Sequence, residues 1–300
     1  MKAIVLREVD GPLALEDVPA PVGEAIVDVR AAGVNFADIL IRHGRYPQMP
    51  ELPYVPGSEV AGMLGDRRVL AFAVGAGGGY AQQAAVQPEW VFDLPAGASF
   101  GAGASFLLTY LTAYIPLTRQ VRVSRGSAVL VHAGSGGVGS AAIQIAKHFG
   151  ATVVATASSD EKRAFARAMG ADEAVGYDEI DDLRVDVVMD PVGGDIYTRS
   201  LPLLKPLGQL VAIGYTAGLW DDPNMAWLVG RNAGVQGVYL ARLIRHEPEL
   251  VRKCVGELLT LWADERINPA VGSSFPLSDA EEAHALIESR RHVGKVILEP

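Results

Sequence analysis

One stretch of the sequence carries a glycine spacing that could bind a phosphate group. Segment 129–139 reads Val-Leu-Val-His-Ala-Gly-Ser-Gly-Gly-Val-Gly, and its glycines at positions 134, 136 and 139 follow the pattern G-x-G-x-x-G. The pattern directly follows a predicted strand and opens a predicted helix, which is the context in which it binds dinucleotides. Glycine lets the backbone approach a pyrophosphate, while the helix start offers unpaired N–H groups and a positive dipole end. We therefore predict a dinucleotide site, and weigh it against a glycine-rich turn that binds no ligand.

The end of the second predicted strand indicates which dinucleotide binds. A site selective for NAD usually places Asp or Glu about 20 residues after the glycines, where it holds the ribose 2′-hydroxyl. Here the strand ends in Thr156-Ala-Ser-Ser159 and is followed by Asp160, Glu161 and Lys162. Small hydroxyls and a lysine suit a 2′-phosphate, whereas the two acids would complement the helix dipole. We expect NADPH rather than NADH, with the alternative that Lys162 is a solvated surface residue.

The cysteine, histidine and serine patterns argue against a metal site and against a hydrolase nucleophile. Cys254 is the only cysteine, so no intrachain disulfide can form and no zinc site can use two thiolates. The histidines, at positions 43, 132, 148, 246, 284 and 292, include no pair at the close spacing typical of metal ligands. Gly134-Ser135-Gly136 lacks the G-x-S-x-G spacing of a hydrolase nucleophile elbow. The sequence predicts neither a metal site nor a hydrolase nucleophile.

The elements that must position these residues differ along the chain. The first hundred residues are β-rich, with short apolar or alternating runs at 3–6, 25–31, 60–64, 68–73 and 80–86 and a helical candidate at 37–42. Glycines at positions 75, 77, 78 and 79 predict a tight connection. The tail returns to this pattern, with strand-like sequence at 269–276, a helix at 278–289 and a strand at 294–298.

From residue 124 onward, strands and helices alternate. We predict strands at 127–133, 151–157, 174–175, 185–189 and 209–213, and helices at 137–149, 160–169 and 250–261. This alternation predicts parallel β-α-β units and a Rossmann dinucleotide-binding domain. The fold class is therefore α/β, with one domain over 1–117 and 267–300 and the Rossmann domain over 118–266.

Composition narrows the class of protein. The 300 residues are 49% hydrophobic and 20% charged, which excludes wholesale disorder and fits about two domains. A formal charge of −9 disfavours nucleic acids and anionic membranes as partners. The apolar run after Lys2 is too short for a signal-peptide core, and glycines and prolines interrupt the uncharged stretch 94–118. We expect a cytoplasmic protein that binds a small molecule and spans no membrane.

Several short motifs follow one another along the chain, and each of them occurs once. They are Val34-Asn-Phe-Ala-Asp38, Arg42-His-Gly-Arg-Tyr46-Pro47, Pro53-Tyr-Val-Pro-Gly57-Ser-Glu59-Val-Ala-Gly62, Leu111-Thr-Ala-Tyr114, the loop 132–139, Ala155-Thr-Ala-Ser-Ser159, Asp190-Pro-Val-Gly-Gly194 and Gly294-Lys-Val-Ile297. Together they resemble the zinc-free quinone oxidoreductase (zeta-crystallin-like) branch of the medium-chain dehydrogenase/reductase superfamily. The match spans nearly the whole chain. Zinc-dependent members carry Gly-His-Glu where this chain has Gly57-Ser58-Glu59, so the resemblance implies a zinc-free mechanism.

The resemblance implies a GroES-like β-rich catalytic domain, a Rossmann domain and a cleft between them. It implies hydride transfer from NADPH to quinones or activated enones, with Asn35 and Tyr46 as catalytic candidates beside the nicotinamide and Thr112 near its carboxamide. The further cofactor contacts that it implies are Gly136, Gly137, Val138, Gly139, Ser158, Ser159, Lys162, Tyr177, Gly214, Tyr215 and Arg290. It also implies homodimers that pair through the strand 235–239.

Alternatives remain open. Asn35 could serve only the loop backbone, and Tyr46 could be a packed loop aromatic. Relative to the family, the chain is shorter between Gly62 and Asp66, and a common helix is largely missing between Tyr177 and Val185, which changes the setting of Tyr177. The competing functions are an enoyl-thioester reductase and a non-catalytic NADPH-binding protein.

Overall fold

The chain folds into two units that divide the sequence unevenly. A computed structural model describes residues 1–73 and 77–300, so the predicted glycine connection is described at positions 77–79, and Gly75 lies outside the described residues. The first unit comprises Met1–Leu108 and Pro269–Pro300, and the second comprises Thr109–Asn268. The first boundary therefore lies at 108/109 and not at the predicted 117/118, and the second lies at 268/269 and not at 266/267.

The displaced first boundary has a physical reason. Helix α3 (Leu107–Ile115), which we assigned wholly to the first domain, lies almost entirely in the second unit. The side-chain amide of Gln144, on helix α4 (Gly137–His148), donates to the hydroxyl oxygen of Tyr110 on α3 at 2.9 Å. This contact joins α3 to the elements of the second unit.

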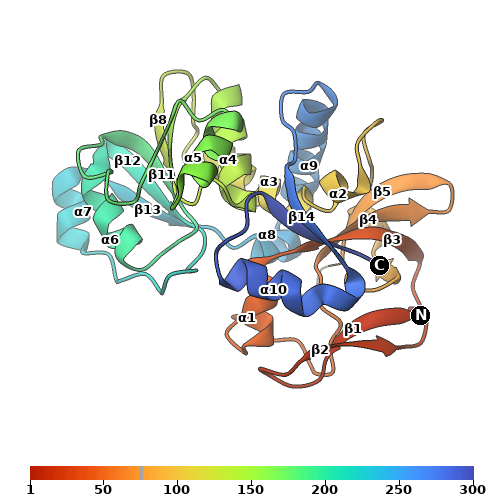
Figure 1. Ribbon diagram of the computed structural model, residues 1–300. Coiled ribbons are helices and arrows are strands. Elements are labelled where there is room, and N and C mark those ends of the chain that lie inside the picture. Colours follow the sequence, from red (N-terminus) through yellow and green to blue (C-terminus); the bar gives the residue numbers. More distant parts are fainter. Residues whose placement is uncertain (74–76) are drawn as a thin grey trace. The chain divides into compact units, whose positions relative to one another are not determined.

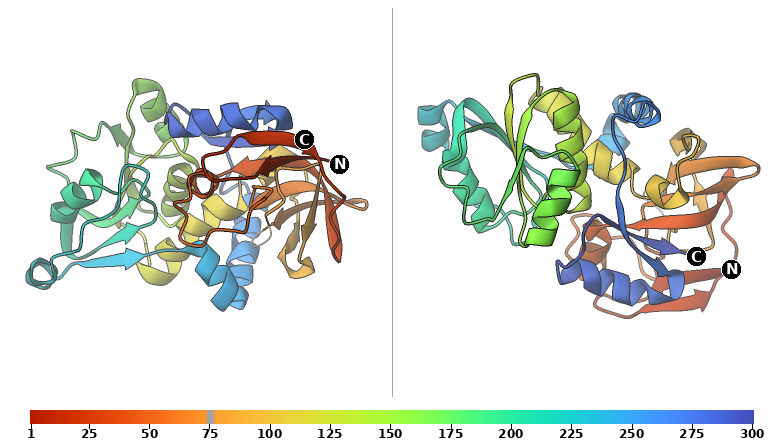
Figure 2. Two further views of the ribbon diagram at one scale, coloured as in Figure 1. Left: turned by 90° about the horizontal axis from the view of Figure 1, so that it is seen from below. Right: turned by 45° about the horizontal axis from the view of Figure 1, so that its top comes forward.

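The second unit is built on a six-stranded parallel sheet with the order β10-β9-β8-β11-β12-β13. Helices α4 and α5 (Asp160–Ala168) lie on one face, and α6 (Asp195–Ser200) and α7 (Met225–Arg231) lie on the other (Figures 1 and 2). The strand order reverses between β8 and β11, which is the Rossmann arrangement. The strands are β8 (Ala128–Val131), β9 (Thr152–Thr156), β10 (Glu173–Val175), β11 (Val185–Asp190), β12 (Leu204–Ala212) and β13 (Gly234–Gly237).

The continuous apolar sequence of the central strands follows from this layering. Val129, Leu130 and Val131 are all buried because helices cover both faces of the sheet. Two helices follow β13, namely α8 (Leu240–His246) and α9 (Pro248–Ala263). Segment 176–184, between β10 and β11, is described without a helix, as its short length indicated.

The first unit is β-rich, as predicted. Its seven-stranded sheet has the order β14-β15-β3-β4-β5-β7, and β6 pairs with β3 outside this path. The strands are β3 (Ala25–Val34), β4 (Glu59–Leu64), β5 (Arg67–Phe72), β6 (Gln83–Val86), β7 (Val91–Asp93), β14 (Val271–Pro276) and β15 (Lys295–Glu299). A separate pair joins β1 (Lys2–Leu6) to β2 (Leu13–Asp17). Strand β15 lies antiparallel to β3, with Ile297 opposite Gly33, so the tail of the chain completes the N-terminal sheet.

Three helices of the first unit flank these strands. Helix α1 (Phe36–Arg42) follows β3 directly and contacts α10 (Ala280–Glu288), while α2 (Phe100–Gly103) contacts β3 and β4. The run Phe100–Gln120 is long and apolar enough to cross a membrane by length and composition alone. However, 78% of its most apolar window is buried within the protein, which is typical of a core helix.

One predicted strand needs correction, and two strands were not predicted. The strand predicted at 80–86 begins only at Gln83, because Tyr80 donates its N–H to Pro56 O, and Ala81 forms only an isolated bridge with Ala3. Strands β2 and β7 have no counterpart among the strands that we predict from the sequence. Strand β2 has the partly exposed sequence Leu-Ala-Leu-Glu-Asp and β7 has only three residues, so neither carries a clear apolar alternation.

Candidate functional site

The predicted phosphate cradle lies between the end of β8 and the start of α4. Gly136 is the N-cap of α4, and no side chain caps this helix within the described part of the loop. The first-turn N–H groups of α4 are therefore available to an anion. A Cβ atom at Gly139 would lie 2.1 Å from the carbonyl oxygen of Ala133, so only glycine fits there. Ala133 itself has φ +51°, a left-handed conformation that costs roughly 1 kcal/mol for a residue with a side chain.

A second glycine-dependent turn follows β11 at the same edge of the sheet. Asp190 is buried, and its Oδ1 accepts from the N–H groups of Val192 at 2.8 Å and Gly193 at 3.0 Å. Its Oδ2 is buried without a partner among the described residues, and burial raises the pKa of this carboxyl. Both turns lie at the carboxyl ends of the strands where the strand order reverses, which is where open α/β sheets bind ligands.

The residues predicted around a 2′-phosphate lie after β9 and β10. Ser159 is the N-cap of α5, and its Oγ accepts from the N–H of Lys162 at 3.3 Å. Ser158 is exposed, whereas Lys162 is half-buried, and burial lowers the pKa of its ammonium group. Tyr177 is half-buried in the loop after β10, with its ring 6.0 Å from that of His132 at an interplanar angle of 20°.

His132 joins three of these elements and was not predicted to do so. Its Nδ1 lies 2.9 Å from Thr156 Oγ1, and its Nε2 lies 2.7 Å from Ser200 Oγ. The Ser200 hydroxyl donates to Ile196 O, so Nε2 carries the proton and donates to Ser200, and Thr156 donates to Nδ1. Burial lowers the pKa of His132 to about 3, which keeps the ring neutral. His132 therefore ties the ends of β8, β9 and α6 together beside Tyr177.

Three further predicted cofactor residues lie on other elements of the second unit. Gly214 follows β12 and approaches the loop after β11, since a Cβ atom there would lie 2.8 Å from Pro191 O. The next residue, Tyr215, meets the ring of Trp220 edge to face, with centroids 5.2 Å apart. Thr112 lies half-buried on α3.

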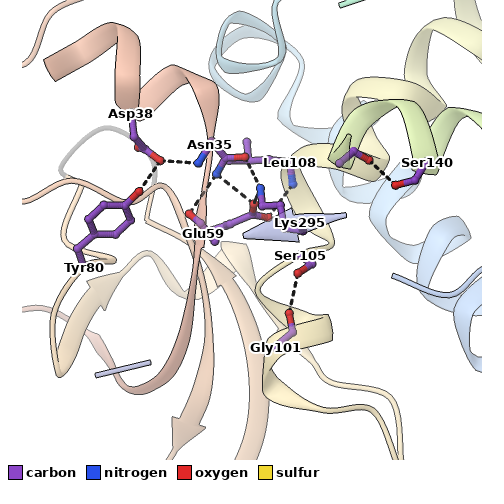
Figure 3. Close-up of polar contacts among 11 residues, drawn as sticks. Asn35, Asp38, Glu59, Tyr80, Gly101, Ser105, Leu108, Ser140 and Lys295 are labelled. Atoms are coloured by element: carbon purple, nitrogen blue, oxygen red, sulfur yellow. Dashed lines mark hydrogen bonds and ion pairs between the residues drawn. The ribbon is translucent and has the colours of Figure 1, made fainter. Parts of the chain in front are cut away.

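In the first unit, Asn35 stands at the N-cap of α1 within a network of charged groups (Figure 3). Its Nδ2 donates to Gly33 O at 3.2 Å and to Glu59 Oε1 at 3.1 Å, and its Oδ1 accepts from Lys295 Nζ. Lys295 also donates to Glu59 Oε1 at 2.7 Å, and both charged side chains are at least 95% buried. Glu59 Oε2 accepts from the N–H of Leu108 at 3.0 Å.

A second buried cluster adjoins the backbone of Asn35. The N–H of Asn35 donates to Asp38 Oδ2 at 2.8 Å, and the Tyr80 hydroxyl donates to the same oxygen. Because the Tyr80 proton is used, the 3.3 Å contact between Tyr80 O and His284 Nε2 requires that His284 donate. Burial raises the pKa of Asp38 to about 6, although the Asn35 N–H, the Tyr80 hydroxyl and Lys295 act against this. Burial also lowers the pKa of His284 to about 3.

Two predicted residues of the first unit have plainer settings. Tyr46 is half-buried in the loop after α1 and packs against the hydrophobic core of this unit. Arg290 is exposed two residues after the end of α10, in the left-handed conformation with φ +55°.

Glu59 and Lys295 are not among the functional residues that we predict from the sequence. The signal was present, because each is a charged residue at the start of an apolar strand, in Glu59-Val-Ala and Lys295-Val-Ile. Charged residues are almost never fully buried unless paired, so two such residues of opposite sign predict an ion pair. The sequence does not show which strands pair, so it does not show that these two residues meet.

The donor set is poor in metal ligands. Within residues 1–73 and 77–300, no group of three or more His, Cys, Asp or Glu side chains could hold a metal ion. Ser58 occupies the central position of the Gly-Ser-Glu motif and offers only a hydroxyl. Residues 169–298 nevertheless match the family described as zinc-binding dehydrogenase, and residues 21–75 match the alcohol dehydrogenase GroES-like domain.

The chain is similar to known proteins over nearly its whole length. Mouse quinone oxidoreductase is 32% identical over 99% of this chain and 97% of its own length. The quinone oxidoreductase of Thermus thermophilus, solved also in complex with NADPH, is 38% identical with a TM-score of 0.91, and the similarity covers 100% of both chains. A mycobacterial protein complexed with NADPH is 33% identical, also with a TM-score of 0.91 over 100% of both chains. These similarities confirm the predicted Rossmann and GroES-like domains, and the chain belongs to the quinone oxidoreductases of the medium-chain dehydrogenase/reductase superfamily.

Proposed function

We propose that this oxidoreductase transfers hydride from NADPH to quinones or activated enones. The observation that carries the proposal is the uncapped, glycine-dependent start of α4 at the point where the sheet order reverses. The complexes of two similar proteins with NADPH support it.

The described residues fit a dinucleotide phosphate. Gly136, Gly137, Val138 and Gly139 would present backbone N–H groups to the pyrophosphate, since a side chain at position 139 would fill the space. Bound NADPH would supply the hydride, and the protein would hold donor and acceptor in line. Gly214 and Tyr215 would line the dinucleotide further along, with Thr112 near the nicotinamide carboxamide and Arg290 as a remaining contact.

Four side chains support NADPH over NADH. Ser158, Ser159, Lys162 and Tyr177 would surround the 2′-phosphate, and they supply hydroxyls and one cation where an NAD site supplies a carboxylate. Burial of Lys162 lowers the pKa of its ammonium group, and a phosphate dianion would oppose that shift. A charge-assisted hydrogen bond at this site would contribute about 1.5–3 kcal/mol, or less where solvent screens it.

We assign Asn35 and Tyr46 to the acceptor end as residues that orient the nicotinamide or the substrate. The chemistry proceeds without zinc in this proposal, because Ser58 replaces a histidine and Cys254 is the only thiol. The final proton then comes from solvent.

We further propose a homodimer that pairs through β13. This strand lies at the edge of its sheet, and an unpaired edge invites pairing with a second copy. Leu207 and Val229 expose 79% and 73% of their surface, on β12 and α7 respectively. Strand β13 ends at Gly237, and Tyr239, at the end of the predicted pairing segment 235–239, is the N-cap of α8, so pairing would use residues 234–237. A cytoplasmic location fits the single cysteine.

The test is NADPH oxidation with 1,2-naphthoquinone, with crotonyl-CoA and without an acceptor. We expect rapid NADPH oxidation with 1,2-naphthoquinone and not under the other two conditions. Preference for crotonyl-CoA would identify an enoyl-thioester reductase. Tight NADPH binding without turnover of either acceptor would identify a non-catalytic NADPH-binding protein and overturn the proposal.

A further inference from the structure

The Asn35 carboxamide has no hydrogen-bond donor left for a ligand. Its two N–H bonds are both used, one on Gly33 O and one on Glu59 Oε1. An ammonium group can only donate, whereas a backbone carbonyl oxygen and a carboxylate accept. The reverse orientation would place the amide nitrogen against Lys295 and the amide oxygen against Glu59. The chemistry of its partners therefore fixes which way this amide points (Figure 3).

We propose that Glu59 and Lys295 are positioning residues, which hold the Asn35 carboxamide with both N–H bonds turned inward so that it recognises a hydrogen-bond donor on the ligand. The inference rests on the proposed function, which assigns Asn35 to the nicotinamide end. It changes one part of that assignment, because Asn35 then cannot donate to the carbonyl oxygen of a quinone or enone.

The ion pair is built to keep this orientation. Glu59 is held at both oxygens, by Lys295 and Asn35 at Oε1 and by the Leu108 N–H at Oε2. A Cβ atom at Gly33 would lie 2.6 Å from Glu59 Oε1, so a side chain at position 33 would collide with the carboxylate in this position. Buried ion pairs contribute little net stability relative to apolar residues, and their best attested use is to specify one arrangement.

Two donors could meet the Asn35 oxygen. One is the carboxamide N–H of the nicotinamide, and the other is a hydroxyl of the acceptor or of its reduced product. Both share the same chemistry, an N–H or O–H directed at an amide oxygen. The two sources can be separated because 3-acetylpyridine adenine dinucleotide phosphate replaces the carboxamide with a methyl ketone and so lacks the donor.

The experiment compares the binding of NADP⁺ and of this analogue by calorimetry. For wild-type protein we expect NADP⁺ to bind about fivefold to tenfold more tightly, as one hydrogen bond allows. Asn35→Ala should abolish the preference. Lys295→Met should abolish it as well, and should have no further effect in the Asn35→Ala background, because Lys295 acts through Asn35.

A second variant guards against loss of folding. Glu59→Gln combined with Lys295→Met removes both charges but keeps an acceptor for Asn35 Nδ2, and we expect the same loss of preference. The matched control is Arg42→Met, which breaks the ion pair with Glu281 on α10 at 2.7 Å without touching the Asn35 carboxamide. This control should lower the melting temperature and retain the preference.

Each outcome decides the matter. If the preference is absent in wild type but the KM for a hydroxynaphthoquinone depends on Lys295 through Asn35, the donor is the acceptor hydroxyl and the proposal stands. The positioning role is rejected if the effects of Lys295→Met and Asn35→Ala on the binding preference are additive. It is also rejected if the preference survives in the variant that combines Glu59→Gln with Lys295→Met. If wild-type protein binds neither dinucleotide, the proposed function fails first and this inference fails with it.

Discussion

The hydroxyl of Tyr80 donates to Oδ2 of Asp38 across 3.0 Å, and both side chains are at least 99% buried. The same oxygen accepts the N–H of Asn35 at the start of α1. The carboxylate thus links the helix that carries Asn35 to a buried tyrosine, and the charge state of Asp38 affects the folding equilibrium.

We predict that Asp38→Asn changes the pH dependence of stability between about pH 4 and 6. The folded pKa of Asp38 is about 6, against an ordinary value of 3.8, so the folded state holds the proton more tightly. Ionisation of this group therefore destabilises the fold as pH rises through that window, by roughly 3 kcal/mol. Urea unfolding at pH 4.5, 5.5 and 6.5 should show that the variant gains stability relative to wild type as pH rises. Asp66→Asn, at an exposed turn, is the control, and a constant difference between Asp38→Asn and wild type would contradict the assignment.

We predict the opposite pH effect for His132→Leu. The pKa of His132 falls from 6.5 to about 3 on folding, so its contribution is present above pH 6.5 and is lost as pH falls toward 3. When the pH falls from 7.5 to 5, the free energy of unfolding of wild-type protein should decrease by about 2 kcal/mol because of this residue, and the variant should not show this decrease. At pH 7.5 the variant should itself be less stable by about 1–3 kcal/mol, because Thr156 and Ser200 lose their partner. The exposed His246→Leu is the comparison, and equal acid sensitivity in His132→Leu and wild type would exclude a buried neutral His132.

Gly139→Ala should weaken NADPH binding by at least tenfold. The new Cβ atom would meet the backbone oxygen of Ala133 at 2.1 Å, and the loop can relieve this contact only by moving away from the start of α4. The control is Gly256→Ala on α9, where an added Cβ has no atom within 4 Å, and this change should raise stability by about 0.5–1 kcal/mol. Calorimetry with NADPH measures the first effect, and unchanged affinity in a folded variant would contradict the cradle.

Lys162→Ala should raise the KM for NADPH by about tenfold and leave the KM for NADH unchanged. The physical reason is the loss of one cationic donor to the 2′-phosphate. Lys147→Ala is the control within the second unit, because Lys147 is paired with Asp172 at 2.7 Å. Steady-state kinetics with both cofactors decides the question. A ratio of efficiencies equal to that of wild type would remove Lys162 from the cofactor site.

Local sequence patterns predicted the second unit well and the charged network of the first unit poorly. The glycine turn, its strand and its helix lie within 129–149, so short-range spacing was sufficient to place Gly136 at the start of α4. Asn35, Glu59 and Lys295 are brought together by strand pairings across 24 to 260 positions. Periodicity indicates that such a residue lies in a strand, but it does not say which strands pair. The strand prediction also failed at Tyr80, where the partner is closer in sequence. Its N–H donates to Pro56 O in a loop outside any strand.

The place of Lys295 in the chain has a consequence for biosynthesis. Residues 109–268 form the whole second unit, so the ribosome synthesises all of that unit before it reaches residues 269–300. Until then the N-terminal sheet lacks β14 and β15, and Glu59 lacks its countercharge. The N-terminal segment must therefore remain incomplete while the whole downstream unit is synthesised. A chain that ends before Lys295 would lack both β15 and the cation that pairs with Glu59, so its N-terminal sheet should not reach the folded state.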